Sequence, residues 1–169
     1  KELERSATLT PHVVVTGQHR AMLDQVNEAF DIEPEIDLDI FAPGQGLETT
    51  ASKTLERLTP VLKDLRPDAL VVQGDTSSAF VAGLAAFYQQ IPVFHVEAGL
   101  RTETIWSPFP EEGNRRLLTR ISSLHLAPTA VSKQNLLDEG VDPATVAVTG
   151  NTVIDALLET VATPRPFEN

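Results

Sequence analysis

The chain has 169 residues, and 41% of them are hydrophobic, which is enough to bury the core of one domain. Thirteen basic residues against 24 acidic ones give a formal net charge of -11, which argues against a surface for nucleic acid or anionic membranes. The sequence has no cysteine, which excludes a disulfide framework and a thiolate metal site. It also has no visible signal peptide and no apolar run near the ~20 residues of a membrane span. Together these features predict a cytoplasmic protein.

Along the chain, short apolar runs bounded by turn residues alternate with segments of helical periodicity. This alternation predicts a parallel sheet covered by helices on both faces. We therefore predict the α/β class and a three-layer Rossmann-like domain over residues 1–162, followed by a linker at 163–169. No GxGxxG motif occurs, so no dinucleotide site is indicated. In chain order, the predicted elements are strand 12–16, helix 19–30, strand 35–40, helix 47–66, strand 69–73, helix 76–89, strand 92–96, helix 110–121, strand 123–127, helix 129–139, strand 146–148 and helix 152–162.

Acidic side chains stand at three places where these elements begin or end. Asp75 follows the strand at 69–73, Glu97 follows the strand at 92–96, and Glu111 opens the helix at 110–121. Ligands of open α/β sheets bind at the carboxyl ends of the strands. We therefore expect Asp75 and Glu97 at the carboxyl ends of adjacent strands, lining a ligand crevice.

Two of these acids also have a purely structural interpretation. Asp75 could cap the helix that follows it, although Thr76 or Ser77 could do so instead and leave Asp75 free. Glu97 could remain unpaired, with the raised pKa that a proton-transfer group needs. Alternatively, Arg101, four residues further on, simply pairs with it.

The other charged residues of this region are equally open to two interpretations. A histidine in a strand, such as His95, is more often a packed, hydrogen-bonded core residue than a ligand. Glu111–Arg115 and Glu112–Arg116 are i,i+4 pairs of favourable orientation, so surface pairing explains all four residues. However, the helix dipole does not favour two arginines so near a helix start. An arginine at this position makes more sense if it binds an anion.

Six segments occur in an order that resembles the non-hydrolysing UDP-N-acetylglucosamine 2-epimerases: VTGQHRAMLDQV, PGQGL, VVQGDTSSA, IPVFHVEAGLRT, SPFPEEGNRR and TGNTVIDAL. The resemblance covers nearly the whole chain, and HVEAGLRT followed by PEExNR is its specific part. It implies the N-terminal half of a GT-B-type two-domain fold, with the active site in the cleft between the domains. It also implies interconversion of UDP-N-acetylglucosamine and UDP-N-acetylmannosamine, by elimination of UDP to 2-acetamidoglucal and re-addition, without a metal or cofactor.

By match to the family's motifs, the resemblance assigns roles to individual residues. Asp75, Glu97 and Glu111 match the essential carboxylates, and which of them moves the proton at C2 stays open. Arg115 matches the essential arginine. A homodimer formed through the N-terminal domain and a place in bacterial cell-envelope polysaccharide biosynthesis are also expected. The remaining assignments are His95 and Arg101 as substrate-binding residues, and Gln18, His19 and Gln45 as a possible regulatory site.

The chain also departs from the family's pattern. The family's first strand, its GTRPE-type loop and its second domain, with a catalytic histidine, have no counterpart here, and Arg116 stands where a small polar residue is common. We therefore expect the 169-residue chain alone to be inactive. Two alternatives are a sugar-nucleotide-binding or glycosyltransferase GT-B half-domain and a non-catalytic dimerisation module. Simple binding would not need three acids, which argues against the first.

Overall fold

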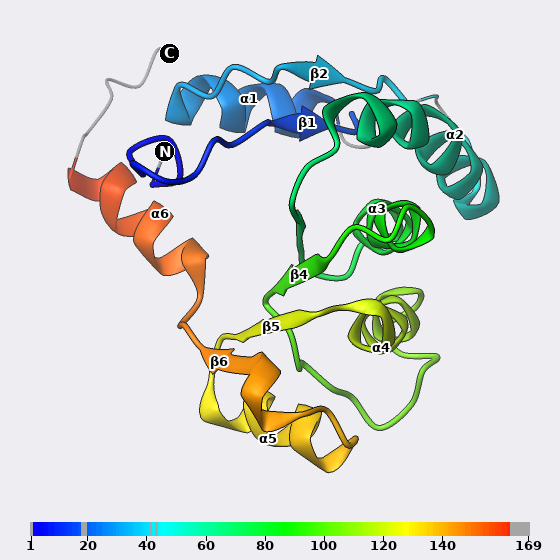
Figure 1. Ribbon diagram of the computed structural model, residues 1–169, viewed down its shortest axis with the longest axis vertical. Helices are drawn as coiled ribbons and strands as arrows, with labels where there is room; N and C mark the ends of the chain where they lie inside the picture. The colour runs from blue at the N-terminus through cyan, green and yellow to red at the C-terminus, as the bar shows by residue number, and fades with distance from the viewer. Residues whose placement is uncertain (1, 18–19, 41, 43, 163–169) are drawn as a thin grey trace. The chain divides into compact units, whose positions relative to one another are not determined.

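The computed structural model describes residues 2–17, 20–40, 42 and 44–162 (Figure 1). By its internal contacts the chain divides into two compact units, Lys1–Arg66 and Pro67–Asn169, and each is described by itself. The single domain expected over residues 1–162 stays a prediction. Among the described residues no helix is both long and apolar enough to span a membrane.

The first unit is a small α/β unit. Its two strands pair in parallel, with Val14 opposite Ile36 and Val15 opposite Asp37. Both strands are shorter than predicted, but backbone hydrogen bonds continue past their ends, from Leu38 N to Val15 O at 2.8 Å and onward. The elements of this unit are β1 (Val14–Val15), α1 (Arg20–Phe30), β2 (Ile36–Asp37) and α2 (Leu47–Leu65).

The second unit contains a four-stranded parallel sheet with the strand order β3-β4-β5-β6. The predicted α/β class and the parallel sheet with flanking helices are confirmed. The sequence missed one short 3-10 helix, where the Asp142 side chain accepts a hydrogen bond from Ala144 N at 2.9 Å. The elements are β3 (Leu70–Gln73), α3 (Ser77–Tyr88), β4 (Val93–Val96), α4 (Glu111–Ile121), β5 (Leu124–Ala127), α5 (Ala130–Asp138), η1 (Pro143–Thr145), β6 (Val146–Val148) and α6 (Thr152–Ala162).

Small residues let the helices of the second unit pack closely. Within this unit, α3 and α4 lie side by side next to β4 and β5 (Figure 1). A Cβ atom added at Gly83 of α3 would meet Leu118 Cδ2 at 2.7 Å, so the glycine makes room for a fully buried leucine of α4. A separate cluster around α5 consists of Ala98, Ala127, Leu136 and Val146. The loop after β4, which carries Glu97, is thus anchored in this cluster by Ala98.

Replacing Gly99 by alanine is expected to lower the free energy of unfolding by about 3 kcal/mol or more. Gly99 has φ +89°, and an added Cβ would clash with the backbone oxygen of Ser132 and lie 3.0 Å from Leu136 Cγ. Gly140 is a matched control, because it has φ +82° and nothing within 4 Å of an added Cβ. Gly140→Ala should therefore lose only the backbone strain, about 1–2 kcal/mol. Urea-induced unfolding measures both, and equal losses would contradict the clash.

Candidate active site

Asp75 lies in the turn between β3 and α3. Gly74 has φ +72°, and its N–H donates to Val96 O at 3.0 Å, which carries the β3–β4 pairing into the turn. Thr76 is the N-cap residue of α3, and its side chain accepts from Ala79 N at 3.1 Å. The interpretation of Asp75 as the helix cap is therefore wrong, since the residue after it is the cap. The Asp75 carboxylate is left to meet a side chain of α4.

Glu97 follows β4 and lies beside the same turn. A Cβ added at Gly74 would be 3.6 Å from Glu97 Oε2, so this carboxylate faces the turn that carries Asp75. Because β3 and β4 are adjacent and parallel, with Gln73 opposite Val96, both acids stand at neighbouring carboxyl ends, as predicted. Glu97 has φ +66°, which is uncommon for a residue other than glycine.

Arg101 does not pair with Glu97. Its guanidinium donates two hydrogen bonds to the carboxylate of Glu139, at 2.7 and 2.9 Å, and a third to Thr119 Oγ1 at 2.9 Å. This pairing holds the pKa of the Glu139 carboxyl below its usual range. The structural interpretation of Glu97 as the partner of Arg101 is therefore wrong. A role for Arg101 in substrate binding stays a prediction.

Arg115 of α4 connects the Asp75 turn to a buried carboxylate. Its Nη2 donates to Asp75 Oδ2 at 2.5 Å, and its Nη1 lies 3.3 Å from Glu112 Oε2. Glu112 is fully buried and accepts further hydrogen bonds from Arg116 Nε at 2.6 Å and from Thr102 N at 3.1 Å. The predicted Glu112–Arg116 pair is confirmed, whereas Arg115 contacts Asp75 and Glu112 in place of Glu111.

Glu111 is the first residue of α4 and is half-buried. Within the part of the chain that the structure describes, its side chain makes no hydrogen bond or ion pair, whereas Asp75 is tied to Arg115. Glu111 lies one helical turn before Arg115, so both belong to the start of α4. The site therefore combines one ion-paired carboxylate and one unpaired carboxylate with Glu97 at the neighbouring strand end. The catalytic roles of the three stay predictions.

His95 is fully buried in β4, opposite His125 of β5. Its Nε2 lies 2.8 Å from Gly74 O, and no partner of its Nδ1 is found among the described residues. Burial lowers the pKa of His95 to about 4, so the imidazole is neutral at pH 7 and its Nε2–H donates to the carbonyl. The interpretation of His95 as a packed, hydrogen-bonded core residue is confirmed, and contact with a substrate stays a prediction.

Replacing His95 by glutamine is expected to reduce the loss of stability on acidification. The unfolded imidazole takes up its proton near pH 6.5, whereas the folded one does so at about 4. Between these values the unfolded state binds more protons, so the free energy of unfolding falls as the pH falls, by about 3 kcal/mol over the whole window. Urea midpoints at pH 7.5 and 4.5 measure this loss. An equal loss in wild type and H95Q would show that His95 is not its source.

Two asparagines at the site carry contacts that the sequence did not predict. Asn114 Nδ2 donates to the backbone oxygen of Asp75 at 2.8 Å, and Asn151 Nδ2 lies 3.5 Å from Glu97 Oε1. Their only signal in the sequence is that they stand in the PEEGNRR and TGNTVIDAL segments. Residue type alone does not mark either asparagine as a site residue, because asparagine is also common in helix caps and turns.

The possible regulatory residues lie in the first unit. Gln18 and His19 lie outside the described residues. Gln45 Nε2 donates to Thr50 Oγ1 at 3.0 Å, and its Oε1 accepts from Lys53 Nζ at 3.3 Å. Both contacts are local to the start of α2, so a regulatory role for Gln45 stays a prediction.

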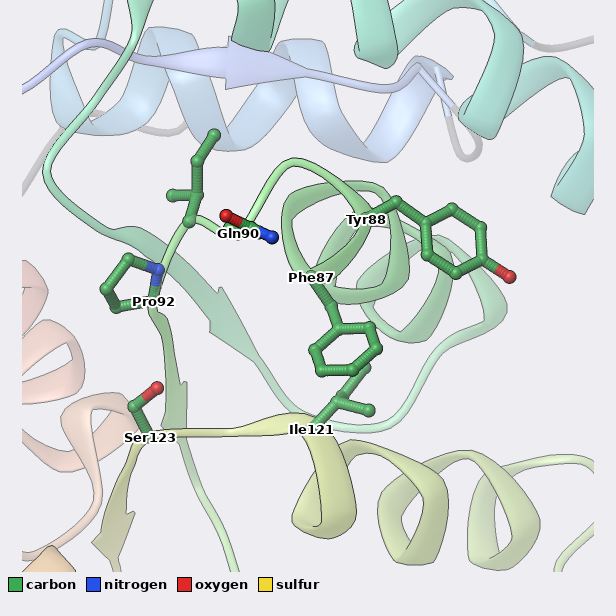
Figure 2. Close-up of a pocket in the computed structure, with 7 residues that line it drawn as sticks. Phe87, Tyr88, Gln90, Pro92, Ile121 and Ser123 are labelled. Carbon is green, nitrogen blue, oxygen red and sulfur yellow. The ribbon is translucent and has the colours of Figure 1, made fainter.

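A surface pocket of the second unit is lined by residues around the end of α3 and the starts of β4 and β5 (Figure 2). Pro92 and Ser123 come just before β4 and β5, so the pocket is at the amino ends of these strands. Asp75 and Glu97 are at the carboxyl ends of β3 and β4. Among the described residues no group of three histidine, aspartate or glutamate side chains could hold a metal ion. The pocket is lined by Phe87, Tyr88, Gln90, Ile91, Pro92, Ile121 and Ser123.

Known proteins match both the sequence and the structure of this chain. The chain is 52% identical over 157 residues to UDP-N-acetylglucosamine 2-epimerase of Neisseria meningitidis, which covers 93% of the chain and 42% of that protein. It is 51% identical over 169 residues to a putative UDP-N-acetylglucosamine 2-epimerase of Thermotoga maritima, which covers 100% of the chain and 44% of that protein. The chain thus spans less than half the length of these curated relatives and matches their N-terminal part.

Solved structures agree with these matches. The crystal structure of the N. meningitidis enzyme bound to UDP-GlcNAc has a TM-score of 0.92 at 51% identity, covering 95% of this chain and 43% of that one. The Methanocaldococcus jannaschii enzyme in complex with UDP-GlcNAc and UDP has a TM-score of 0.88 at 36% identity, covering 95% and 44%. The family model described as UDP-N-acetylglucosamine 2-epimerase matches residues 1–166. The chain therefore belongs to the UDP-N-acetylglucosamine 2-epimerase family.

Proposed function

We propose that this chain supplies the catalytic carboxylates of a non-hydrolysing epimerase that interconverts UDP-N-acetylglucosamine and UDP-N-acetylmannosamine. The observation that carries the proposal is the meeting of Asp75, Glu97 and Arg115 at the carboxyl ends of β3 and β4. Structures of relatives with UDP-GlcNAc bound support a UDP-sugar as the substrate. As in those relatives, the activity belongs to a protein more than twice as long as this chain.

The proposed reaction requires a base, an acid and a cation at the site. A base removes the proton at C2 of the sugar while the C1–O bond breaks and UDP leaves, which gives 2-acetamidoglucal. In re-addition, an acid protonates C2 from the opposite face, and UDP returns to C1. Two carboxylates on opposite faces of the ring can do this, and a cation such as Arg115 stabilises the diphosphate.

Proton exchange with the solvent tests the proposal. We expect the full-length protein that carries this sequence to convert UDP-N-acetylglucosamine in D₂O to a mixture with UDP-N-acetylmannosamine, both deuterated at C2. Proton NMR follows the loss of the C2 signal. A sugar-nucleotide-binding or glycosyltransferase half-domain would bind the nucleotide but leave C2–H intact. Binding without exchange would therefore overturn the epimerase proposal in favour of that alternative.

Further properties of the full-length protein belong to the same proposal. We infer a homodimer formed through the N-terminal domain, a cytoplasmic location and a reaction without metal or cofactor. The product would feed cell-envelope polysaccharide biosynthesis in a bacterium. The alternative of a non-catalytic dimerisation module predicts self-association with no binding of UDP-N-acetylglucosamine, so size measurement combined with ligand titration separates the two.

The 169-residue chain alone is expected to form no UDP-N-acetylmannosamine. Catalysis in a two-domain cleft requires the diphosphate and the sugar ring to be held together, and positioning can lower the barrier by several kcal/mol. The chain spans 42% of its N. meningitidis relative, so it offers one wall of such a cleft. NMR of the purified chain with UDP-N-acetylglucosamine measures this, with the full-length protein as positive control. A rate within about tenfold of the control would mean that these residues contain the whole catalytic apparatus.

A further inference from the structure

Two buried side chains hold consecutive backbone carbonyls of the Asp75 turn. His95 Nε2 donates to Gly74 O at 2.8 Å, and Asn114 Nδ2 donates to Asp75 O at 2.8 Å. His95 is 0% exposed and Asn114 is 7% exposed. They come from β4 and α4, so two different elements each hold one of two consecutive carbonyls in this turn. We refer to His95 and Asn114 as the carbonyl clamp.

The turn needs such contacts because its backbone leaves the β ladder. Gly74 has φ +72°, so the backbone turns where β3 ends, and the carbonyl oxygens of Gly74 and Asp75 accept from the side chains of His95 and Asn114. A buried carbonyl without a hydrogen bond costs about 1–3 kcal/mol. Gly74 and Asp75 are half-buried, so the clamp removes part of that cost, and it also limits the position of the Asp75 main chain relative to β4 and α4.

The clamp acts beside the ion pair that orients the Asp75 side chain. Asn114 holds the carbonyl of Asp75, and the next residue of α4, Arg115, donates to its carboxylate at 2.5 Å. Glu111 lies three and four residues before them, on the same side of the helix. The position of Asp75 is therefore linked through α4 to Glu111 and through β4 to Glu97, the other two proposed catalytic acids.

We infer that Asn114 and His95 are positioning residues for Asp75, acting on the reaction only through the placement of its carboxylate. The inference rests on the proposed function. A misplacement of about 1 Å can lower a rate about 100-fold. A weakened clamp therefore lowers turnover far more than it changes substrate affinity.

A double-mutant cycle in the full-length protein tests this inference. Asn114→Ala is expected to lower kcat about tenfold or more, with KM within about twofold. In the Asp75→Asn background the same change should lower kcat less than about twofold, because the group that it positions is already lost. His95→Leu should behave in the same way, and His95→Gln should restore most of the activity because it keeps an N–H donor.

Asn135 provides the matched control. Its Nδ2 donates to Gly99 O at 2.9 Å, the same type of contact made from α5 to a different loop. Asn135→Ala should lower kcat by the same factor with and without Asp75→Asn. If Asn114 had only a structural role, Asn114→Ala would likewise lower kcat by the same factor in both backgrounds.

The outcomes separate the inference from the proposed function. If the unmodified full-length protein exchanges no C2 proton, the proposed function fails. If it is active and Asn114→Ala costs the same factor in both backgrounds, or costs nothing, the inference is overturned. If far-UV circular dichroism shows that Asn114→Ala does not fold, the His95 cycle decides by the same criteria.

Discussion

Replacing Asp75, Glu97 or Glu111 by its amide is expected to lower turnover of the full-length protein by about 100-fold or more. Each amide keeps the shape of the acid but can neither accept the C2 proton nor return one as an acid. For Asp75 the change also removes the charge that meets Arg115 Nη2 at 2.5 Å. The NMR exchange assay at saturating UDP-N-acetylglucosamine measures each variant.

A matched acid outside the site controls for the change in charge. Asp138 is exposed at the end of α5, where its Oδ1 accepts from Gln134 Nε2 at 2.7 Å. Asp138→Asn should leave turnover within about twofold, as surface substitutions usually do. Thermal unfolding should show that the amide variants remain folded. Near-normal turnover of any of the three would mean that this acid has a structural role only.

The order and type of the elements in the second unit could be predicted because local signals were consistent. The apolar runs at 69–73 and 92–96 are bounded by turn residues, and β3 and β4 lie within one residue of them. Parallel pairing of consecutive strands then brings their carboxyl ends together, so the juxtaposition of Asp75 and Glu97 followed from topology.

Partner choice could not be predicted, because it depends on tertiary structure. Asp75, Thr76 and Ser77 could each cap α3 by sequence, whereas in the fold Thr76 is the cap and the Asp75 carboxylate accepts from Arg115. The long side chain of Arg101 likewise reaches Glu139, 38 residues later, in place of Glu97. The four-residue spacing from Glu97 to Arg101 did not determine the pairing, because the fold offers Arg101 a stronger bidentate contact with the Glu139 carboxylate.

Glu111 and Glu112 show the same limit. Both stand in the first turn of a helix, where acids complement the dipole, so composition does not distinguish them. Neighbouring helix residues point about 100° apart, and the orientation of α4 against its unit decides which one is buried. The structure leaves Glu111 half-buried and Glu112 completely buried. The pair with Arg116 that was predicted to lie on the surface therefore has one fully buried member, Glu112, and one partly exposed member, Arg116.

Replacing Glu112 by glutamine is therefore expected to lower the free energy of unfolding by about 3–5 kcal/mol. The Glu112 side chain is 0% exposed, and it lies 2.6 Å from Arg116 Nε and 3.3 Å from Arg115 Nη1. The amide can still accept from Thr102 N, but its NH₂ group brings donors toward arginines that carry only donors. Among the described residues, the 11% exposed Arg115 side chain would then keep Asp75 alone as a charged partner.

Urea-induced unfolding of Glu112→Gln and Asp138→Asn compares a buried acid with an exposed one on the same unit. The exposed control should change stability by less than about 0.5 kcal/mol. Arg116 is 39% exposed and lies 3.7 Å from Glu139, so Arg116→Gln should cost less than Glu112→Gln, because Glu112 keeps Arg115 and Thr102 N. A loss of less than about 1 kcal/mol for Glu112→Gln would place this network with ordinary surface ion pairs. Burial of the carboxylate would then contribute nothing to holding Arg115 against Asp75.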